Sequence, residues 1–100
     1  EATRVQGDTV TGHTTRKNDI DYYLLEYAAR KKKRFTVNAA TGSRLKVSVT
    51  DPLGYAVRSV TVTGGAETKF YEMIDRKGYL VVKSMGENYL EPYVITLKDE

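Results

Sequence analysis

The chain lacks cysteine and tryptophan, and it contains a single histidine, His13. Without cysteine there is no disulfide framework, no thiolate metal site and no cysteine nucleophile. With one histidine, a metal site built on two histidines is excluded, and a histidine-centred triad would have to use His13, for which the sequence offers no partner. No apolar run approaches the roughly 20 residues that a transmembrane helix needs. These absences exclude several classes of enzyme and a helical membrane span.

The composition is that of one globular domain. The chain has 100 residues, of which 40% are hydrophobic and 29% are charged. That length suits one domain and is too short for two ordinary ones. We therefore expect a single domain over residues 1–100, with frayed ends at about 1–4 and 98–100. Eight of the ten aromatic residues are tyrosine, which favours half-buried strands.

Period-2 alternation of apolar and polar residues dominates the chain. The clearest case is residues 45–50, where Leu45, Val47 and Val49 alternate with polar residues. Turn signals such as 51–54 and 75–78 recur at roughly ten-residue spacing, which is typical of a sandwich or barrel. The pattern predicts strands over residues 20–27, 35–39, 45–50, 55–62, 68–74, 79–84 and 89–97. We predict an all-β, antiparallel β-sandwich of about eight strands.

The order of these segments resembles a known family. Asn18-Asp19-Ile20-Asp21-Tyr22-Tyr23, the turn Asp51-Pro52-Leu53-Gly54 and the segment Gly78-Tyr79-Leu80-Val81-Val82 follow one another as in bacterial pre-peptidase C-terminal (PPC) domains. The resemblance covers roughly residues 7–98 and implies a jelly-roll-like sandwich, usually attached to secreted proteases. The inhibitors of goose-type lysozyme, which are small periplasmic sandwiches, are similar too. The basic run 30–34 stands where the family usually has Ala-Gly, and the acidic lead-in of calcium-binding members is absent from residues 1–6.

The first acidic segment has two interpretations. By resemblance to calcium-binding members, Asn18, Asp19 and Asp21, together with Asp8, are candidate ligands for a calcium ion. Alternatively, the aspartates cap a loop and accept hydrogen bonds from nearby backbone amides. The second interpretation is the commoner one for aspartates in turns.

The most conspicuous polar feature is a run of five cations, Arg30, Lys31, Lys32, Lys33 and Arg34. We interpret it as a hairpin turn. Its side chains either are solvated and block edge pairing, or contact a partner that carries phosphate, an acidic glycan or an acidic protein surface. The rest of the chain is nearly balanced in charge and shows no recognition helix or RNA-binding motif, which argues against nucleic acid.

The tyrosines divide into two groups. Tyr23, Tyr27, Tyr79 and Tyr93 are predicted on the core face of their strands. Tyr55, Tyr71 and Tyr89 lie next to loops and are the candidates for exposed partner-binding residues. The scattered carboxylates give no pair at a spacing that hydrolysis needs, so we expect no enzymatic activity.

These observations lead to one functional prediction and one alternative. The chain is predicted to be a non-catalytic binding domain, secreted or periplasmic, that contacts a protein or polysaccharide outside the cytoplasm through its loops. The alternative is a stand-alone periplasmic inhibitor of a lysozyme or protease. No cofactor is expected apart from the candidate calcium ion.

Overall fold

The computed structural model describes residues 3–5, 7–13, 19–87 and 92–100. These residues form strands and connecting turns, and within these ranges no helix is long and apolar enough to cross a membrane. The predicted all-β sandwich is confirmed. The strands are β1 (Thr3–Arg4), β2 (Thr9–Gly12), β3 (Ile20–Glu26), β4 (Lys31–Asn38), β5 (Ser43–Thr50), β6 (Ala56–Thr63), β7 (Glu67–Ile74), β8 (Lys77–Glu87) and β9 (Tyr93–Asp99).

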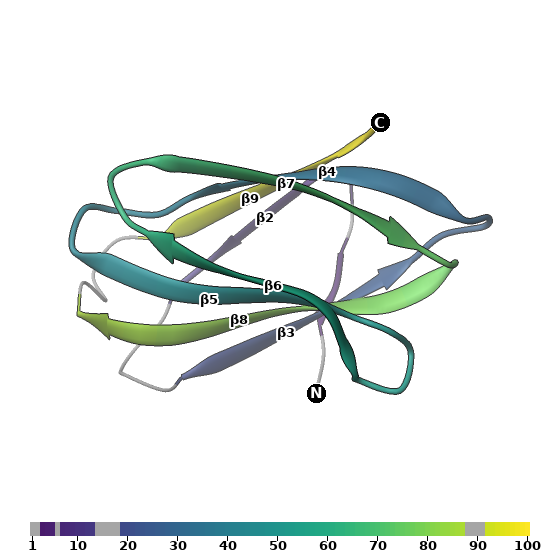
Figure 1. Cartoon of the computed structure of the whole chain (residues 1–100), viewed down its shortest axis with the longest axis horizontal. Coiled ribbons are helices and arrows are strands. Elements are labelled where there is room, and N and C mark those ends of the chain that lie inside the picture. The colour runs from purple at the N-terminus through teal and green to yellow at the C-terminus, as the bar shows by residue number, and fades with distance from the viewer. Residues whose placement is uncertain (1–2, 6, 14–18, 88–91) are drawn as a thin grey trace.

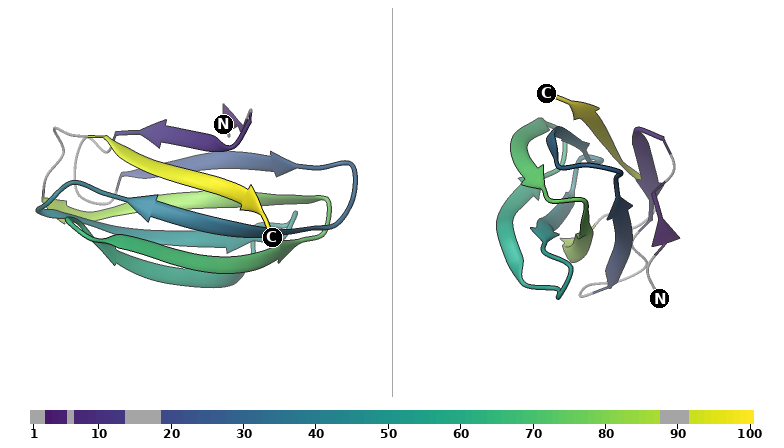
Figure 2. Two further views of the ribbon diagram at one scale, coloured as in Figure 1. Left: turned by 90° about the horizontal axis from the view of Figure 1, so that it is seen from above. Right: turned by 90° about the vertical axis from the view of Figure 1, so that its right-hand side faces the viewer.

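The strands form two sheets that lie face to face (Figures 1 and 2). The first sheet has the order β1-β3-β8-β5-β6, and the second has the order β2-β9-β4-β7. All neighbours are antiparallel except the short pair β1 and β3, which is parallel. The chain crosses between the layers repeatedly, so that strands far apart in sequence, such as β2 and β9, become neighbours. We call the two layers the β8 sheet and the β9 sheet.

The core lies between the sheets and consists of alternating side chains. Leu45, Val47 and Val49 of β5 are buried, as predicted from the sequence. Ile95 and Leu97 of β9 face them from the other layer and are buried as well. Burial of such a side chain contributes roughly 1.5–3 kcal/mol. The alternation that the sequence shows is therefore the pattern that fixes which face of each strand points inward.

The β8 strand corrects one prediction. Leu80 and Val82 are buried, whereas Tyr79 and Val81 are half-buried on the outer face of the β8 sheet. Tyr79 was predicted on the core face. The segment 79–82 is apolar at every position, so its sequence carries no alternation from which the inward phase could be read.

The basic run corrects a second prediction, because it is not a hairpin turn. The chain turns at residues 27–30, and Lys31 already begins β4, which pairs with β7 on one side and β9 on the other. Lys33 points inward and is buried, with its Nζ 2.7 Å from Asp99 Oδ1 and 4.7 Å from the centre of the Tyr27 ring. These two contacts compensate the charge, and the aliphatic stem of the lysine adds to the core.

Two further features concern the turns and the chain end. The connection from β6 to β7 passes between the sheets through Gly64 and Gly65, and a Cβ on Gly64 would overlap the Ala40 carbonyl oxygen. At the C-terminus, β9 includes residues 98 and 99, which the sequence prediction placed in a frayed end, and Glu100 N–H donates to the Lys32 carbonyl at 3.0 Å.

Candidate binding site

The turn between β5 and β6 is held by one aspartate. Asp51 Oδ1 accepts hydrogen bonds from the backbone N–H groups of Leu53 and Tyr55, each at 2.9 Å, and the Asp51 carbonyl accepts from Gly54 N–H at 3.0 Å. Gly54 has a φ of 94°, a left-handed conformation that glycine adopts without strain. The turn therefore has a defined shape, and it presents Leu53 to solvent with 83% of the residue exposed.

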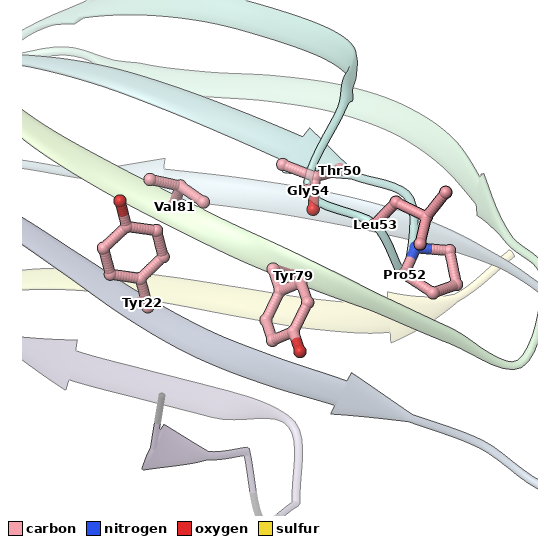
Figure 3. A pocket seen from close by; sticks show the side chains of 7 residues that line it. All are labelled: Tyr22, Thr50, Pro52, Leu53, Gly54, Tyr79 and Val81. Atoms are coloured by element: carbon pink, nitrogen blue, oxygen red, sulfur yellow. The ribbon is translucent and has the colours of Figure 1, made fainter. Parts of the chain in front are cut away.

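Beside this turn the outer face of the β8 sheet is hollowed. Tyr22 on β3 pairs in register with Val81 on β8, and both side chains point outward together with Tyr79. The hollow has a volume of about 260 Å³. Figure 3 shows the Tyr79 ring between Tyr22 and the turn that carries Pro52 and Leu53.

The lining of the hollow is suited to binding and not to catalysis. It consists of two tyrosine rings, aliphatic side chains and one threonine, namely Tyr22, Thr50, Pro52, Leu53, Gly54, Tyr79 and Val81. No carboxylate, histidine or lysine is among these residues, so the lining has no group that would act as an acid or a base near neutral pH. Rigid aromatic rings with polar tips are the side chains that most often anchor interfaces. The hollow is therefore a candidate site for an apolar group of a ligand.

The structure separates the tyrosines that were predicted to bind. Tyr55 directly follows the turn and has 71% of its surface exposed, while Tyr71 is 43% exposed on the outer face of the other sheet. Both are exposed as expected, but they lie on different layers and do not form one surface. Tyr89 lies outside the described residues. Tyr22 was not among the binding candidates. It directly precedes the core-facing Tyr23 on β3, and this alternation indicated that the Tyr22 ring points outward.

The basic run does not form one contact surface. In β4 the side chains of the run alternate between the two faces. Lys32 and Arg34 therefore face outward, while Lys33 faces inward and forms an ion pair with Asp99. Lys32 Nζ lies 5.8 Å from the centre of the Tyr71 ring. Arg30 precedes the strand and is exposed, and Lys31 Nζ lies 3.9 Å from Asp99 Oδ2. Partner binding by these five residues stays a prediction.

Of the calcium candidates, Asp21 has a structural partner. The Tyr93 hydroxyl, from the opposite sheet, donates to Asp21 Oδ2 at 2.6 Å and accepts from the Tyr23 hydroxyl, also at 2.6 Å. Burial and the hydrogen bond to the carboxylate raise the pKa of Tyr93 well above its usual value. We call Asp21, Tyr23 and Tyr93 the tyrosine–aspartate chain. A Cβ on Gly12 would overlap the Tyr93 hydroxyl oxygen, so this glycine makes room for the chain.

The other described candidates, Asp19 and Asp8, form backbone contacts. The Asp19 carbonyl accepts from Ser84 N–H at 2.8 Å, and Asp8 uses its own carbonyl to accept from Leu97 N–H at 2.7 Å. Asn18 lies outside the described residues. Among the residues that the structure describes, no group of three or more histidine or acidic side chains is placed to hold a metal ion. Calcium binding stays a prediction.

Comparison with known proteins supports the fold. No protein-family model matches the chain, and a search of curated proteins gives no match. Among solved structures, the chain is similar to the pre-peptidase C-terminal domain of collagenase from Bacillus anthracis, with a TM-score of 0.71 and 19% sequence identity. The match covers 98% of this chain and 95% of that domain. The predicted resemblance to PPC domains is thus confirmed for the fold over nearly the whole chain.

Proposed function

We propose that the chain is a non-catalytic accessory domain of a secreted peptidase and that it binds a stretch of polypeptide in the hollow beside the 51–55 turn. The observation that carries the proposal is the outward-facing lining of Tyr22, Tyr79 and Leu53, which offers apolar contact without any acid or base. The fold is that of a domain attached to a collagenase, an enzyme that acts on a protein polymer. On this proposal the domain works outside the cytoplasm and holds the substrate near a separate catalytic unit.

The shape of the hollow favours an extended chain over a compact ligand. It is partly open to solvent, and it lies between the outer surface of β3 and β8 and the turn that carries Pro52 and Leu53. Tyr22 and Tyr79 stand on neighbouring strands, so a chain laid across them meets one ring after the other. Weak contacts repeated along a polymer give a useful residence time without a deep pocket.

The test is binding of the domain to immobilised gelatin, an extended polypeptide, measured by biolayer interferometry. The double variant Tyr22→Ala and Tyr79→Ala is expected to lose most of the binding. The matched control is Tyr71→Ala, which removes an exposed tyrosine from the outer face of the opposite sheet. Equal binding of the double variant and the wild type would overturn the proposal, and loss in Tyr71→Ala alone would assign the contact to the β9 sheet.

The inhibitor alternative makes a different prediction. An inhibitor would insert a projecting loop into the enzyme, and the 51–55 turn, which exposes Leu53, is a described loop that could do this. The domain would then slow a lysozyme or a protease at a fixed molar ratio, and Leu53→Asp would abolish the effect. An accessory domain leaves the rate of both enzymes unchanged.

A further inference from the structure

Two lysines face each other on the same outer surface as the hollow. Lys46 on β5 and Lys83 on β8 are direct partners in the register of the β8 sheet. Directly opposed side chains have Cβ atoms about 4.5–5.5 Å apart. Arg44 lies two residues before Lys46 on β5 and points to the same side, since the intervening Leu45 is buried. We call Lys46, Lys83 and Arg44 the cationic row.

The row has no compensating charge within the described part of the chain. Some other cations of the domain have carboxylate partners, such as Lys33 with Asp99 and Arg58 with Glu72. No described carboxylate lies within 4.0 Å of the ammonium groups of Lys46 and Lys83. Like charges directly opposite each other on a sheet are destabilising, and an anion placed between them removes that cost.

The distance from the row to the hollow fits an extended peptide. Tyr79, Val81 and Lys83 alternate outward along β8, and alternate residues of a strand are about 7 Å apart. Side chains on one face of an extended peptide have the same period. Val81 and Tyr79 of the hollow lie two and four residues before Lys83. A peptide that lies along β8 with one residue in the hollow therefore places a residue two or four positions further along beside Lys83.

Two hydroxyl groups lie beside this track, next to the hollow. Ser48 on β5 is the register partner of Val81, and its Oγ lies 2.9 Å from Ser59 Oγ on β6. These polar groups can donate to a peptide backbone that crosses between the hollow and the row. The outer face of the β8 sheet thus carries the hollow at one end and the cationic row at the other, with Ser48 beside Val81 of the hollow and the exposed Ile20 beside Lys83.

We propose that the cationic row is an anion subsite of the same binding face and that the partner is an extended polypeptide with an acidic residue two or four positions from an apolar or aromatic one. This inference rests on the proposed function, because it places the ligand in the hollow. A uniformly charged polymer such as a nucleic acid fits less well, because its charges repeat along the whole chain and the hollow offers them no cation.

The test uses two soluble random copolymers, one of glutamate and tyrosine and one of lysine and tyrosine, labelled with a fluorophore and titrated with the domain. The wild type is expected to bind the glutamate copolymer and not the lysine copolymer. The variant Lys46→Gln with Lys83→Gln should lose about tenfold in affinity, which corresponds to two partly exposed ion pairs. Raising the salt concentration should weaken the wild type more than this variant.

The matched control is Lys69→Gln with Lys98→Gln, which removes the same charge from the outer face of the β9 sheet. It should keep the affinity of the wild type within about twofold, since it leaves the binding face intact. Thermal melting of both double variants checks that they are folded.

The outcomes separate the two proposals. If the lysine variant binds like its control while the Tyr22→Ala and Tyr79→Ala variant loses binding, the anion subsite is overturned and the proposed function stands. If only the lysine variant loses binding, the row binds anions and the hollow does not hold the ligand. Binding of the lysine copolymer as tightly as the glutamate copolymer, or loss of affinity in the Lys69 and Lys98 control, would also overturn the subsite.

Discussion

Replacing Tyr93 by phenylalanine removes one oxygen atom from the contact between the two sheets. That oxygen donates to Asp21 Oδ2 at 2.6 Å and accepts from the Tyr23 hydroxyl at 2.6 Å. Only 3% of Tyr93 is exposed, so water cannot easily take its place. The substitution therefore leaves the Asp21 carboxylate without its donor and the Tyr23 hydroxyl without its acceptor.

The loss can be estimated from the two hydrogen bonds. A hydrogen bond to a charged group contributes about 1.5–3 kcal/mol, and one between neutral groups contributes about 1 kcal/mol. Asp21 is partly exposed and regains some hydration, which places its bond at the lower end of that range. We expect Tyr93→Phe to lower the free energy of unfolding by about 2–3 kcal/mol. Tyr23→Phe breaks only the second bond and should cost about 1 kcal/mol.

The measurement is urea denaturation monitored by far-UV circular dichroism. An unchanged slope of the free energy of unfolding against urea concentration indicates that only stability has altered. For a domain of this size the Tyr93→Phe loss corresponds to a fall of about 10–20 °C in Tm. The variant that combines Tyr93→Phe with Tyr23→Phe should lower the free energy of unfolding little more than Tyr93→Phe alone, because Tyr93→Phe already removes the hydrogen bond from the Tyr23 hydroxyl. The reasoning fails if Tyr93→Phe lies within 0.5 kcal/mol of the wild type, or if Tyr23→Phe is the more damaging change.

Three further outcomes are expected. Burial, followed by the hydrogen bond to Asp21, raises the pKa of Tyr93 above its ordinary value of 10.0. The protonated hydroxyl therefore contributes its full stabilisation below pH 10, and this contribution falls as the pH rises further. Urea denaturation at several pH values above 10 should show that the free energy of unfolding falls more steeply for the wild type than for Tyr93→Phe. Ser84 is fully buried, and its hydroxyl has no hydrogen-bond partner in the described structure, so Ser84→Ala should be neutral or stabilise by up to about 1 kcal/mol in the same assay; a loss above that size would reveal a partner. Lys33→Gln should destabilise by about 1–2 kcal/mol, whereas the outward Lys32→Gln should stay within about 0.5 kcal/mol, as thermal melting can check; equal effects would mean that the buried contact contributes nothing.

The fold could be predicted where apolar and polar residues alternate. Leu45, Val47 and Val49 show a pure period of two, and the inward face follows from it. The phase of β8 could not be read, because four apolar residues follow one another, and only the register of the strand against β3 and β5 shows which of them point inward. The basic run was misread for a related reason: five cations look solvated in the sequence, and the compensating Asp99 lies on a strand that is distant in the chain.

The candidate site could not be predicted from the sequence, because its residues are distant in the chain and meet only in the folded sheet. The hollow joins Tyr22 from β3, Tyr79 from β8 and Leu53 from a turn, and no local pattern places these three together. The turn itself was predictable, since the order Asp, Pro, x, Gly specifies it and the structure confirms its hydrogen bonds. What sequence reasoning gave was the list of exposed aromatic candidates, and what it lacked was the register between β3 and β8.

The order of strands in the sheets has a consequence for how the protein is made. β3 meets β8 only late in synthesis, and β2 has its neighbour in β9, the last of the described strands, whereas β4 can pair with β7 before β9 is made. While a ribosome is still producing the second half, β2, β3 and β4 each lack at least one neighbour, and their apolar sides are unprotected. Assembly of the β9 sheet can therefore finish only after residues 93–99 have emerged, so these residues are required for folding, and a chain without them is a target for chaperones or aggregation.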